Sequence, residues 1–124
     1  MFHFPKNQKL CNEKAIERLF ENGKSLAEKP FRIIYNIDNN SDDIFLKSLI
    51  VIPKKRFRLA SDRNVIKRRV KEAYRLQKSE LEKYLKSNNQ QLNLAIIYQK
   101  HEILDYKLIE VKIKLLLSRL KEEL

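Results

Sequence analysis

The chain has 124 residues, of which 43% are hydrophobic, and a formal net charge of +11. This length suits a single domain over residues 1–124, and the apolar content excludes a disordered tail. A charge this large repels itself and is typical of proteins that bind nucleic acid or an anionic membrane surface.

Three features of the sequence bear on its compartment. No apolar run is long enough to cross a bilayer, and residues 1–10 lack the apolar segment of a signal peptide. Cys11 is the single cysteine, which excludes an internal disulfide. We therefore expect a cytoplasmic protein with no membrane partner.

A short helix is predicted near the start of the chain. Asn12 can cap it, because an asparagine side chain accepts hydrogen bonds from the free N–H groups of a first turn. Gly23, the only glycine, can end the helix in the left-handed backbone conformation. The apolar residues of this helix share one face: Ala15, Ile16, Leu19 and Phe20.

Two strands are expected to follow as a hairpin. Apolar residues alternate over 31–37, and the mostly apolar run 44–52 predicts a second strand that is buried on much of both faces. Pro53 ends that second strand. The polar segment 38–43 between the two strands favours a turn, so we expect the strands to pair.

The second half of the chain predicts a helix, a strand and a helix. Ser61 or Asp62 can cap a helix over about 63–85, residues 92–98 form a third strand, and Asp105 can cap the last helix. The order α-β-β-α-β-α predicts a two-layer α+β domain in which helices cover one mixed β-sheet. The apolar side of the last helix consists of Leu108, Ile109, Ile113, Leu116, Leu117 and Leu120.

Residues 54–75 carry the clearest functional signal. They contain ten Lys and Arg and two acids, and therefore hold +8 of the net charge of +11. At helical spacing, one arc carries Asn64, Lys67, Arg68, Lys71 and Arg75, and the adjoining arc carries Ile66, Val70, Ala73 and Tyr74, which can face a core. Arg63 lies near the edge of the apolar arc.

The basic arc has the chemistry of a phosphate-binding surface. Arginine can grip a phosphate with two parallel hydrogen bonds, lysine adds mobile charge, and Asn64 offers a donor and an acceptor for a sugar or base edge. On a face that only contacts solvent, acidic residues would alternate with the basic ones, so RNA or DNA binding is favoured. A membrane-surface helix is the weaker alternative, because the adjoining arc lacks large exposed aromatic residues.

The same stretch resembles the signature of the bacterial ribonuclease P protein subunit. In that family a Lys-Lys pair follows a strand, an Arg-Asn dipeptide opens a helix, and two basic runs continue the helix. The matching residues here are Lys54-Lys55, Arg63-Asn64, Lys67-Arg68-Arg69 and Lys71-Glu72-Ala73-Tyr74-Arg75. The family's N-terminal segment is matched by Phe4, Lys6, Leu10, Phe20 and Gly23, so the resemblance covers nearly the whole chain.

Three positions depart from the family pattern. Val65 replaces a second arginine, Arg56-Phe57 stand where many members have a glycine, and Ile16 stands where an aromatic residue is common. The resemblance implies a ribosomal protein S5 domain 2-like fold with a left-handed βαβ crossover, and a short extra edge strand near Ser25–Ala27.

The resemblance also implies a function. In this family the RNA subunit is the catalyst, and the complex cleaves precursor tRNA to leave the mature 5′ end. The protein is then expected to contribute no catalytic residue and no metal site, to meet Mg²⁺ only through the RNA, and to bind no protein partner. The residues expected to contact the RNA subunit are Arg63, Asn64, Lys67, Arg68, Arg69, Lys71 and Arg75, with Lys54 and Lys55.

The resemblance further implies a cleft that binds the single-stranded 5′ leader. Phe20, Phe31 and Tyr35 are expected to line it, because aromatic faces stack on any base and so accept leaders of varied sequence. Phe20 fits a core position equally well, since it shares a helix face with Ile16 and Leu19.

Two other functions remain open from composition. A ribosomal-type RNA-binding protein without associated catalysis has the same charge, and a helix-in-groove DNA-binding protein is less favoured because the basic helix is flanked by strands. His3, His101 and Cys11 lack the spacing of a zinc site. The single glycine excludes a phosphate-binding loop of the nucleotide-binding type.

Overall fold

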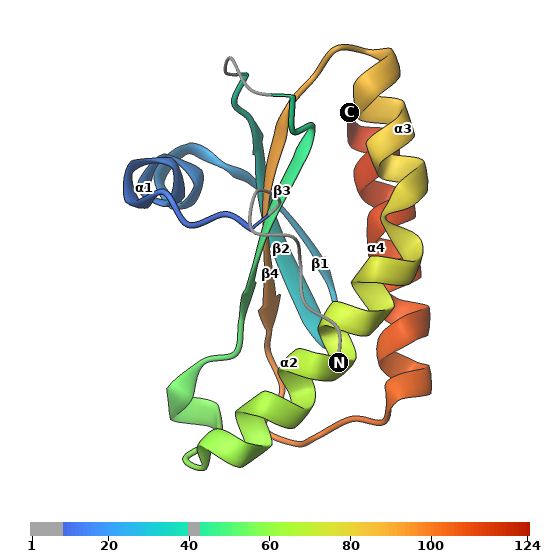
Figure 1. The fold of residues 1–124 in the computed structure, drawn as a ribbon. Coiled ribbons are helices and arrows are strands. Elements are labelled where there is room, and N and C mark those ends of the chain that lie inside the picture. The colour runs from blue at the N-terminus through green and yellow to red at the C-terminus, as the bar shows by residue number, and fades with distance from the viewer. Residues whose placement is uncertain (1–8, 40–42) are drawn as a thin grey trace.

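The computed structural model describes residues 9–39 and 43–124. A four-stranded sheet is covered on one face by three helices, and a fourth helix crosses the other face (Figure 1). The strands are β1 (Lys24–Glu28), β2 (Phe31–Ile37), β3 (Leu46–Val51) and β4 (Leu92–Tyr98). The helices are α1 (Glu13–Asn22), α2 (Ala60–Gln77), α3 (Ser79–Ser87) and α4 (Tyr106–Glu123), with a 3₁₀ turn η2 (Lys54–Arg56) between β3 and α2.

The sheet has the order β1-β2-β4-β3. β1 and β4 pair with β2 antiparallel, and β3 pairs with β4 parallel. The mixed sheet confirms the predicted α+β class, and β1 confirms the edge strand implied by the family. The predicted hairpin between β2 and β3 is wrong, because β4 lies between them.

Burial explains why β4 takes the central place. Nearly all of its residues are buried, whereas those of β3 alternate between buried and partly exposed. A strand that is apolar on both faces is stable only where both faces are covered. The sequence analysis assigned that character to residues 44–52, and the structure shows it in β4 instead.

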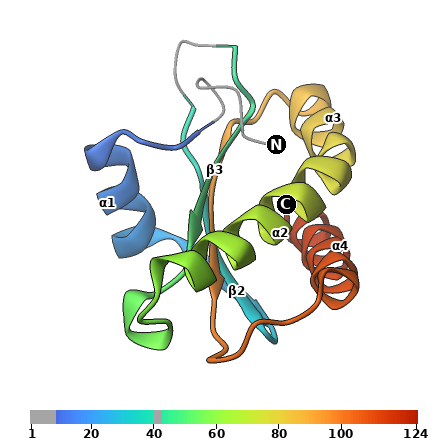
Figure 2. The same cartoon turned by 60° about the horizontal axis from the view of Figure 1, so that its bottom comes forward.

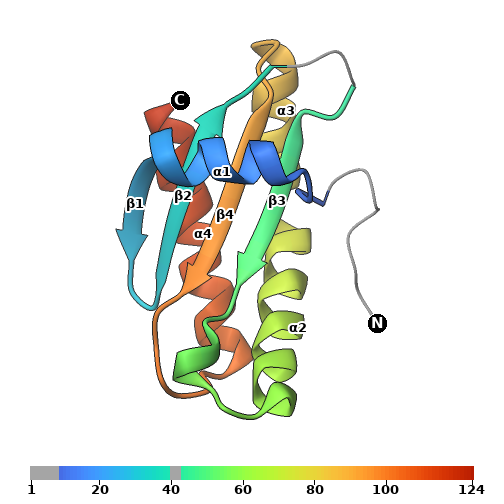
Figure 3. The same ribbon diagram turned by 90° about the vertical axis from the view of Figure 1, so that its left-hand side faces the viewer.

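The connection from β3 through α2 and α3 to β4 is a left-handed crossover. In Figure 3 both strands run downward, the helices lie behind the sheet, and the chain moves leftward from β3 to β4. Parallel β-α-β connections are almost always right-handed. The observed sense is the one implied by the resemblance to the ribonuclease P family.

The main core lies between the sheet and helices α2, α3 and α4. Phe31, Ile33 and Tyr35 of β2 contribute to it, and the Phe31 ring meets the Tyr98 ring edge-on with centroids 5.5 Å apart. The helices supply Ile66, Val70, Ala73, Tyr74, Leu81, Leu85, Ile109, Ile113, Leu116, Leu117 and Leu120. Leu108 was expected on the apolar side of α4, but it is exposed.

Helix α1 packs on the opposite face of the sheet over a smaller apolar cluster. Leu10, Ala15, Leu19 and Ala95 are buried there. Arg18 of α1 forms an ion pair of 2.8 Å with Asp38, which follows β2. Together these contacts hold α1 against the sheet, where Figure 3 shows it lying across β2, β4 and β3.

Both ends of α1 are explained by local chemistry. The Ala15 N–H donates to the Asn12 side chain at 3.1 Å, so the predicted cap is confirmed. Gly23 has φ −71°, which is not left-handed, so the predicted reason for glycine is wrong. A Cβ at this position would lie 2.6 Å from Ile34 Cγ2 and against the Leu19 carbonyl, so glycine is required by close approach.

The helix that was predicted over about 63–85 differs from the observed structure in two ways. It begins at Ala60 after Leu59, so neither Ser61 nor Asp62 caps it, and it divides at Lys78 into α2 and α3. The cap of α4 is as predicted, because the Leu108 N–H donates to Asp105 Oδ1 at 2.9 Å. Within residues 9–39 and 43–124, no helix combines the length and apolarity of a membrane span.

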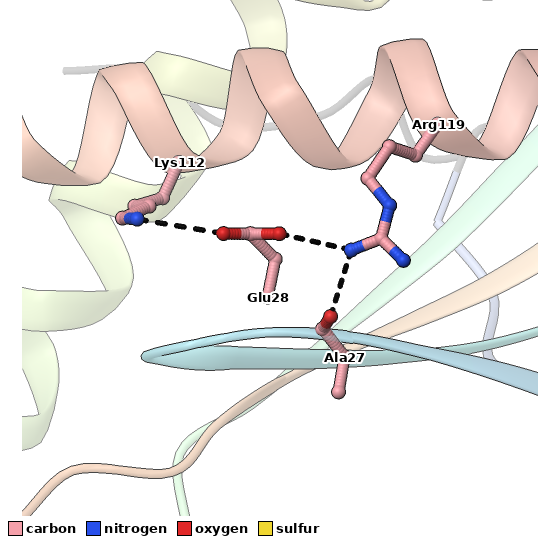
Figure 4. Close-up of polar contacts among 4 residues, drawn as sticks. All are labelled: Ala27, Glu28, Lys112 and Arg119. Carbon is pink, nitrogen blue, oxygen red and sulfur yellow. Dashed lines mark hydrogen bonds and ion pairs between the residues drawn. The ribbon is translucent and has the colours of Figure 1, made fainter.

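A polar cluster joins α4 to the edge strand β1 (Figure 4). Glu28 accepts from Lys112 at 3.5 Å and from Arg119 at 2.9 Å. Arg119 Nη1 also donates to the Ala27 carbonyl at 2.9 Å. An edge strand presents backbone groups to solvent, and this cluster occupies one of them with a charged side chain.

Candidate nucleic-acid interface

Helix α2 presents one basic face to solvent because its other face is anchored in the core. Ile66, Val70, Ala73 and Tyr74 are buried, as the sequence predicted. The side chains opposite form the basic face, which we define as Asn64, Lys67, Arg68, Lys71 and Arg75; Lys71 is partly buried and the others are exposed. A rigid helix therefore holds these groups in one array.

Lys71 of the basic face lies near two other lysines. Burial, and then the nearby charges of Lys67 and Lys9, lower the pKa of its ammonium group. Lys9 reaches this place because Leu10 donates its N–H to the Ser48 carbonyl at 2.9 Å, which ties the N-terminal segment to β3. Like charges held this close favour the binding of an anion.

Arg63 and Arg69 use their guanidinium groups inside the protein. Arg63 Nη1 donates to the Phe57 carbonyl at 2.7 Å, and Arg69 Nη1 donates to the Leu104 carbonyl at 2.7 Å. Both side chains are half-buried. The sequence grouped them with the RNA-binding cations, whereas the structure shows them fixing the segments before α2 and before α4.

Arg75 forms a local pair with Glu72. Its guanidinium donates to both carboxylate oxygens, at 2.9 and 3.2 Å. This hydrogen bond raises the pKa of Arg75. Part of the charge of Arg75 is thus balanced within α2, so Lys67 and Arg68 are better placed to attract phosphate.

Lys54 and Lys55 are exposed on η2. Figures 1 and 2 show that η2 lies on the same side of the sheet as α1, whereas α2 starts there and crosses to the opposite side. The Lys-Lys pair therefore lies near the start of α2, on the α1 side of the sheet.

A row of residues on the sheet face beside α1 lies outside the α1 cluster, at the end of the face nearer η2. Arg32, Ile97 and Val51 are paired across β2, β4 and β3, and we call them the sheet row. Arg32 is exposed and the other two are partly exposed. The adjacent row, Ile34, Ala95 and Leu49, belongs to the apolar cluster under α1.

The three aromatic residues expected in a leader cleft fall into two groups. Phe20 is 45% exposed on α1, so its ring is accessible. Phe31 and Tyr35 are 0% and 5% exposed in the main core. Their placement in a cleft is corrected, because alternate residues of a strand face opposite sides and both point toward the helices.

A family model described as Ribonuclease P matches residues 4–121 of the chain. The chain belongs to this family. It is 31% identical over 109 residues to the ribonuclease P protein component of Porphyromonas gingivalis, which covers 88% of this chain and 80% of that one.

Solved structures of the ribonuclease P family share the fold. The RNase P protein of Staphylococcus aureus matches with a TM-score of 0.73 at 22% identity, over 92% of this chain and 95% of that one. The protein from Thermotoga maritima matches with a TM-score of 0.66 at 22% identity, over 90% and 96%.

Several residues near the proposed surfaces were not predicted from the sequence. Lys9 joins the basic face through an isolated strand contact, and the sheet row is assembled from three strands. The alternation of side chains along β2 could have placed Arg32 and Phe31 on opposite faces of the sheet. It could not have shown which of the two faces stays uncovered. Among residues 9–39 and 43–124, no three His, Cys, Asp or Glu side chains cluster so as to hold a metal ion.

Proposed function

We propose that this chain is the protein component of a ribonuclease P that removes the 5′ leader from precursor tRNA, and that the RNA subunit performs the cleavage. The observation that carries the proposal is the basic face of α2, held rigid on the core of a chain that belongs to the ribonuclease P family. Membership of this family supports a role in tRNA processing and an RNA partner.

On this proposal the basic face binds the catalytic RNA. Its cations neutralise backbone phosphates, and each neutralised phosphate releases condensed counterions. If roughly five phosphates are contacted, log K falls by several units for a tenfold rise in salt. Arg63 and Arg69 support this surface by positioning the segments around α2. Mg²⁺ is bound by the phosphates of the RNA, since a hard cation prefers oxygen ligands.

The leader of precursor tRNA binds on the other side of the sheet. Phe20 offers an exposed ring for base stacking, and the sheet row offers an apolar floor ending in Arg32. Stacking tolerates any base, and the flexible cationic side chain of Arg32 can follow the phosphate backbone of the leader. Both elements lie on the α1 side, so the leader and the catalytic RNA bind different surfaces.

Reconstitution tests the proposal. The protein freed of RNA should leave precursor tRNA intact, and addition of the cognate RNA subunit with Mg²⁺ should produce site-specific cleavage at the mature 5′ end. Robust cleavage by the RNA-free protein would contradict the assignment of the chemistry to the RNA. Copurification of ribosomal RNA in place of a precursor-tRNA-cleaving RNA would favour the ribosomal alternative.

Charge-matched variants test the basic face. Replacing Arg68 and Lys71 together with alanine should weaken binding to the RNA subunit and reduce its salt dependence. Replacing Lys83 and Lys86 of α3 with alanine removes the same charge from another exposed surface and should change binding far less. Equal losses in the two double variants would show that only net charge matters and that the basic face is not the contact.

A further inference from the structure

Arg56 and His101 meet where β3 and β4 end. Because these strands are parallel neighbours, the segments that follow them leave the sheet at the same edge. Arg56 lies in η2, His101 lies beyond β4, and Arg56 Nη1 is 3.1 Å from His101 Nε2. The Phe57 and Tyr98 rings, with centroids 6.0 Å apart, hold the two segments together.

The chemistry of this pair assigns its roles. A guanidinium has only donors, so Arg56 donates and His101 Nε2 accepts, which places the imidazole proton on Nδ1. The contact supplies no carboxylate, so it leaves the arginine charge unbalanced. Arg56 Nε is buried and has no hydrogen-bond partner among the described residues. An incoming oxygen would therefore use the outer N–H groups of the guanidinium, of which one meets His101.

The surroundings are strongly basic. Lys54, Lys55 and Arg58 are exposed next to Arg56 in the chain, and Lys100 precedes His101. The acids nearest in sequence are Asp62 and Glu102. A cluster with this excess of positive charge attracts an anion such as phosphate rather than an apolar ligand.

The location indicates which phosphate is bound. Figures 1 and 3 show η2 on the α1 side of the sheet, at the opposite end of that face from α1. The sheet row lies between them, and Val51 of that row is followed closely by η2 in the chain. A single strand laid from α1 across the row runs toward η2, which carries Arg56.

We propose that Arg56, positioned by His101, binds a backbone phosphate of the single-stranded 5′ leader. This inference rests on the proposed function and adds a contact beyond the basic face and Phe20. Arg56-Phe57 stand where many family members have a glycine.

The test uses the assembled complex of protein, RNA subunit and Mg²⁺. Binding of a non-cleavable precursor tRNA with a leader of about ten nucleotides is compared with binding of mature tRNA, over a series of KCl concentrations. R56A should weaken binding of the leader-bearing substrate about tenfold, as expected for one charge-assisted phosphate contact, and leave mature tRNA unaffected. For R56A, the slope of log K against log KCl concentration should become shallower by about 0.7, the value for one phosphate of a single strand.

Matched variants separate charge from folding. R56K keeps the charge and should keep the salt slope, while K83A on α3 should leave both substrates unaffected. R56Q removes the charge but keeps a long polar side chain, so it repeats the test if the melting curve shows that R56A is destabilised.

His101 is tested as a positioning residue. H101A should reduce leader affinity in the same direction as R56A, because the guanidinium loses its acceptor. H101Q should restore it, since the glutamine carbonyl oxygen can accept from Arg56 Nη1. Rescue by glutamine would not follow if the ring served only for packing.

The outcomes distinguish the two proposals. A wild-type complex that fails to cleave precursor tRNA overturns the proposed function. Only the role of Arg56 is overturned if the wild-type complex cleaves and prefers the leader-bearing substrate, and the R56A complex binds each substrate as tightly as the wild type does. Weaker binding of the RNA subunit by R56A, with no leader-dependent loss, assigns the phosphate to the RNA subunit and also overturns the inference.

Discussion

The two faces of the sheet use the same strands for different purposes. Toward α2, α3 and α4, β2 presents Phe31 and Tyr35, which are buried in the main core. Toward α1, the same strand presents Arg32, which is exposed. An aromatic residue in a strand therefore says little about ligand binding until the coverage of its face is known.

The largest effect on stability is expected from a substitution on the sheet face that α2, α3 and α4 cover. Replacing Phe31 with alanine leaves a cavity against Tyr98 and should lower the free energy of unfolding by about 3–5 kcal/mol. Urea denaturation followed by circular dichroism measures this. A loss below about 1 kcal/mol would mean that Phe31 is not a core residue and would reopen its place in a leader cleft.

The opposite outcome is expected for Phe20 on the α1 side. Alanine at this position removes an exposed ring, so the change in unfolding free energy should stay below about 1 kcal/mol. Leader-bearing precursor tRNA should bind the complex more weakly by about 1–3 kcal/mol, the value of a lost base stack. Mature tRNA is the control, and unchanged affinity for both substrates in a folded variant would remove Phe20 from the leader site.

Neighbouring arginines of α2 allow a finer comparison. Arg69 donates to the Leu104 carbonyl, so Arg69→Ala should cost about 1–2 kcal/mol of stability. Arg68 is exposed, and Arg68→Ala should change stability by less than about 0.5 kcal/mol while weakening binding to the RNA subunit. Thermal melts and RNA titrations of both variants check this, and equal melting temperatures would show that the Arg69 contact does not stabilise the fold.

The smallest effect concerns Lys71. Its pKa is lowered in the folded protein from the ordinary 10.5, so its positive charge opposes folding at neutral pH. That penalty is complete below the lowered pKa and disappears as the pH rises to the unfolded value. Lys71→Met should therefore raise stability at pH 7 by less than about 1 kcal/mol, and the gain should shrink in alkaline buffer.

Binding to the RNA subunit gives the matching readout for Lys71→Met. It should weaken although the protein becomes more stable, because a charge that opposes folding can favour RNA binding. Melting temperatures of the variant below those of the wild type at pH 7 would contradict the electrostatic reading of this position.

Most single elements could be predicted because their signals are local. The helical period of residues 63–75 identified both the buried arc and the basic face, and Asn12 and Asp105 were recognised as caps from one side chain each. The edge strand and the left-handed crossover were implied by the family resemblance and not by the residues alone.

The sequence by itself determined most of the helices and strands and the sign and spacing of charge on α2, since these depend on neighbours within a few residues. Only the tertiary structure decided that β4 separates β2 from β3, that Phe31 and Tyr35 face the core, and that Arg69 is held by a backbone carbonyl. It also brought His101 to Arg56, 45 residues away in the chain. These features depend on which strands pair and which face is covered, and pairing between distant segments leaves no periodic mark in the sequence.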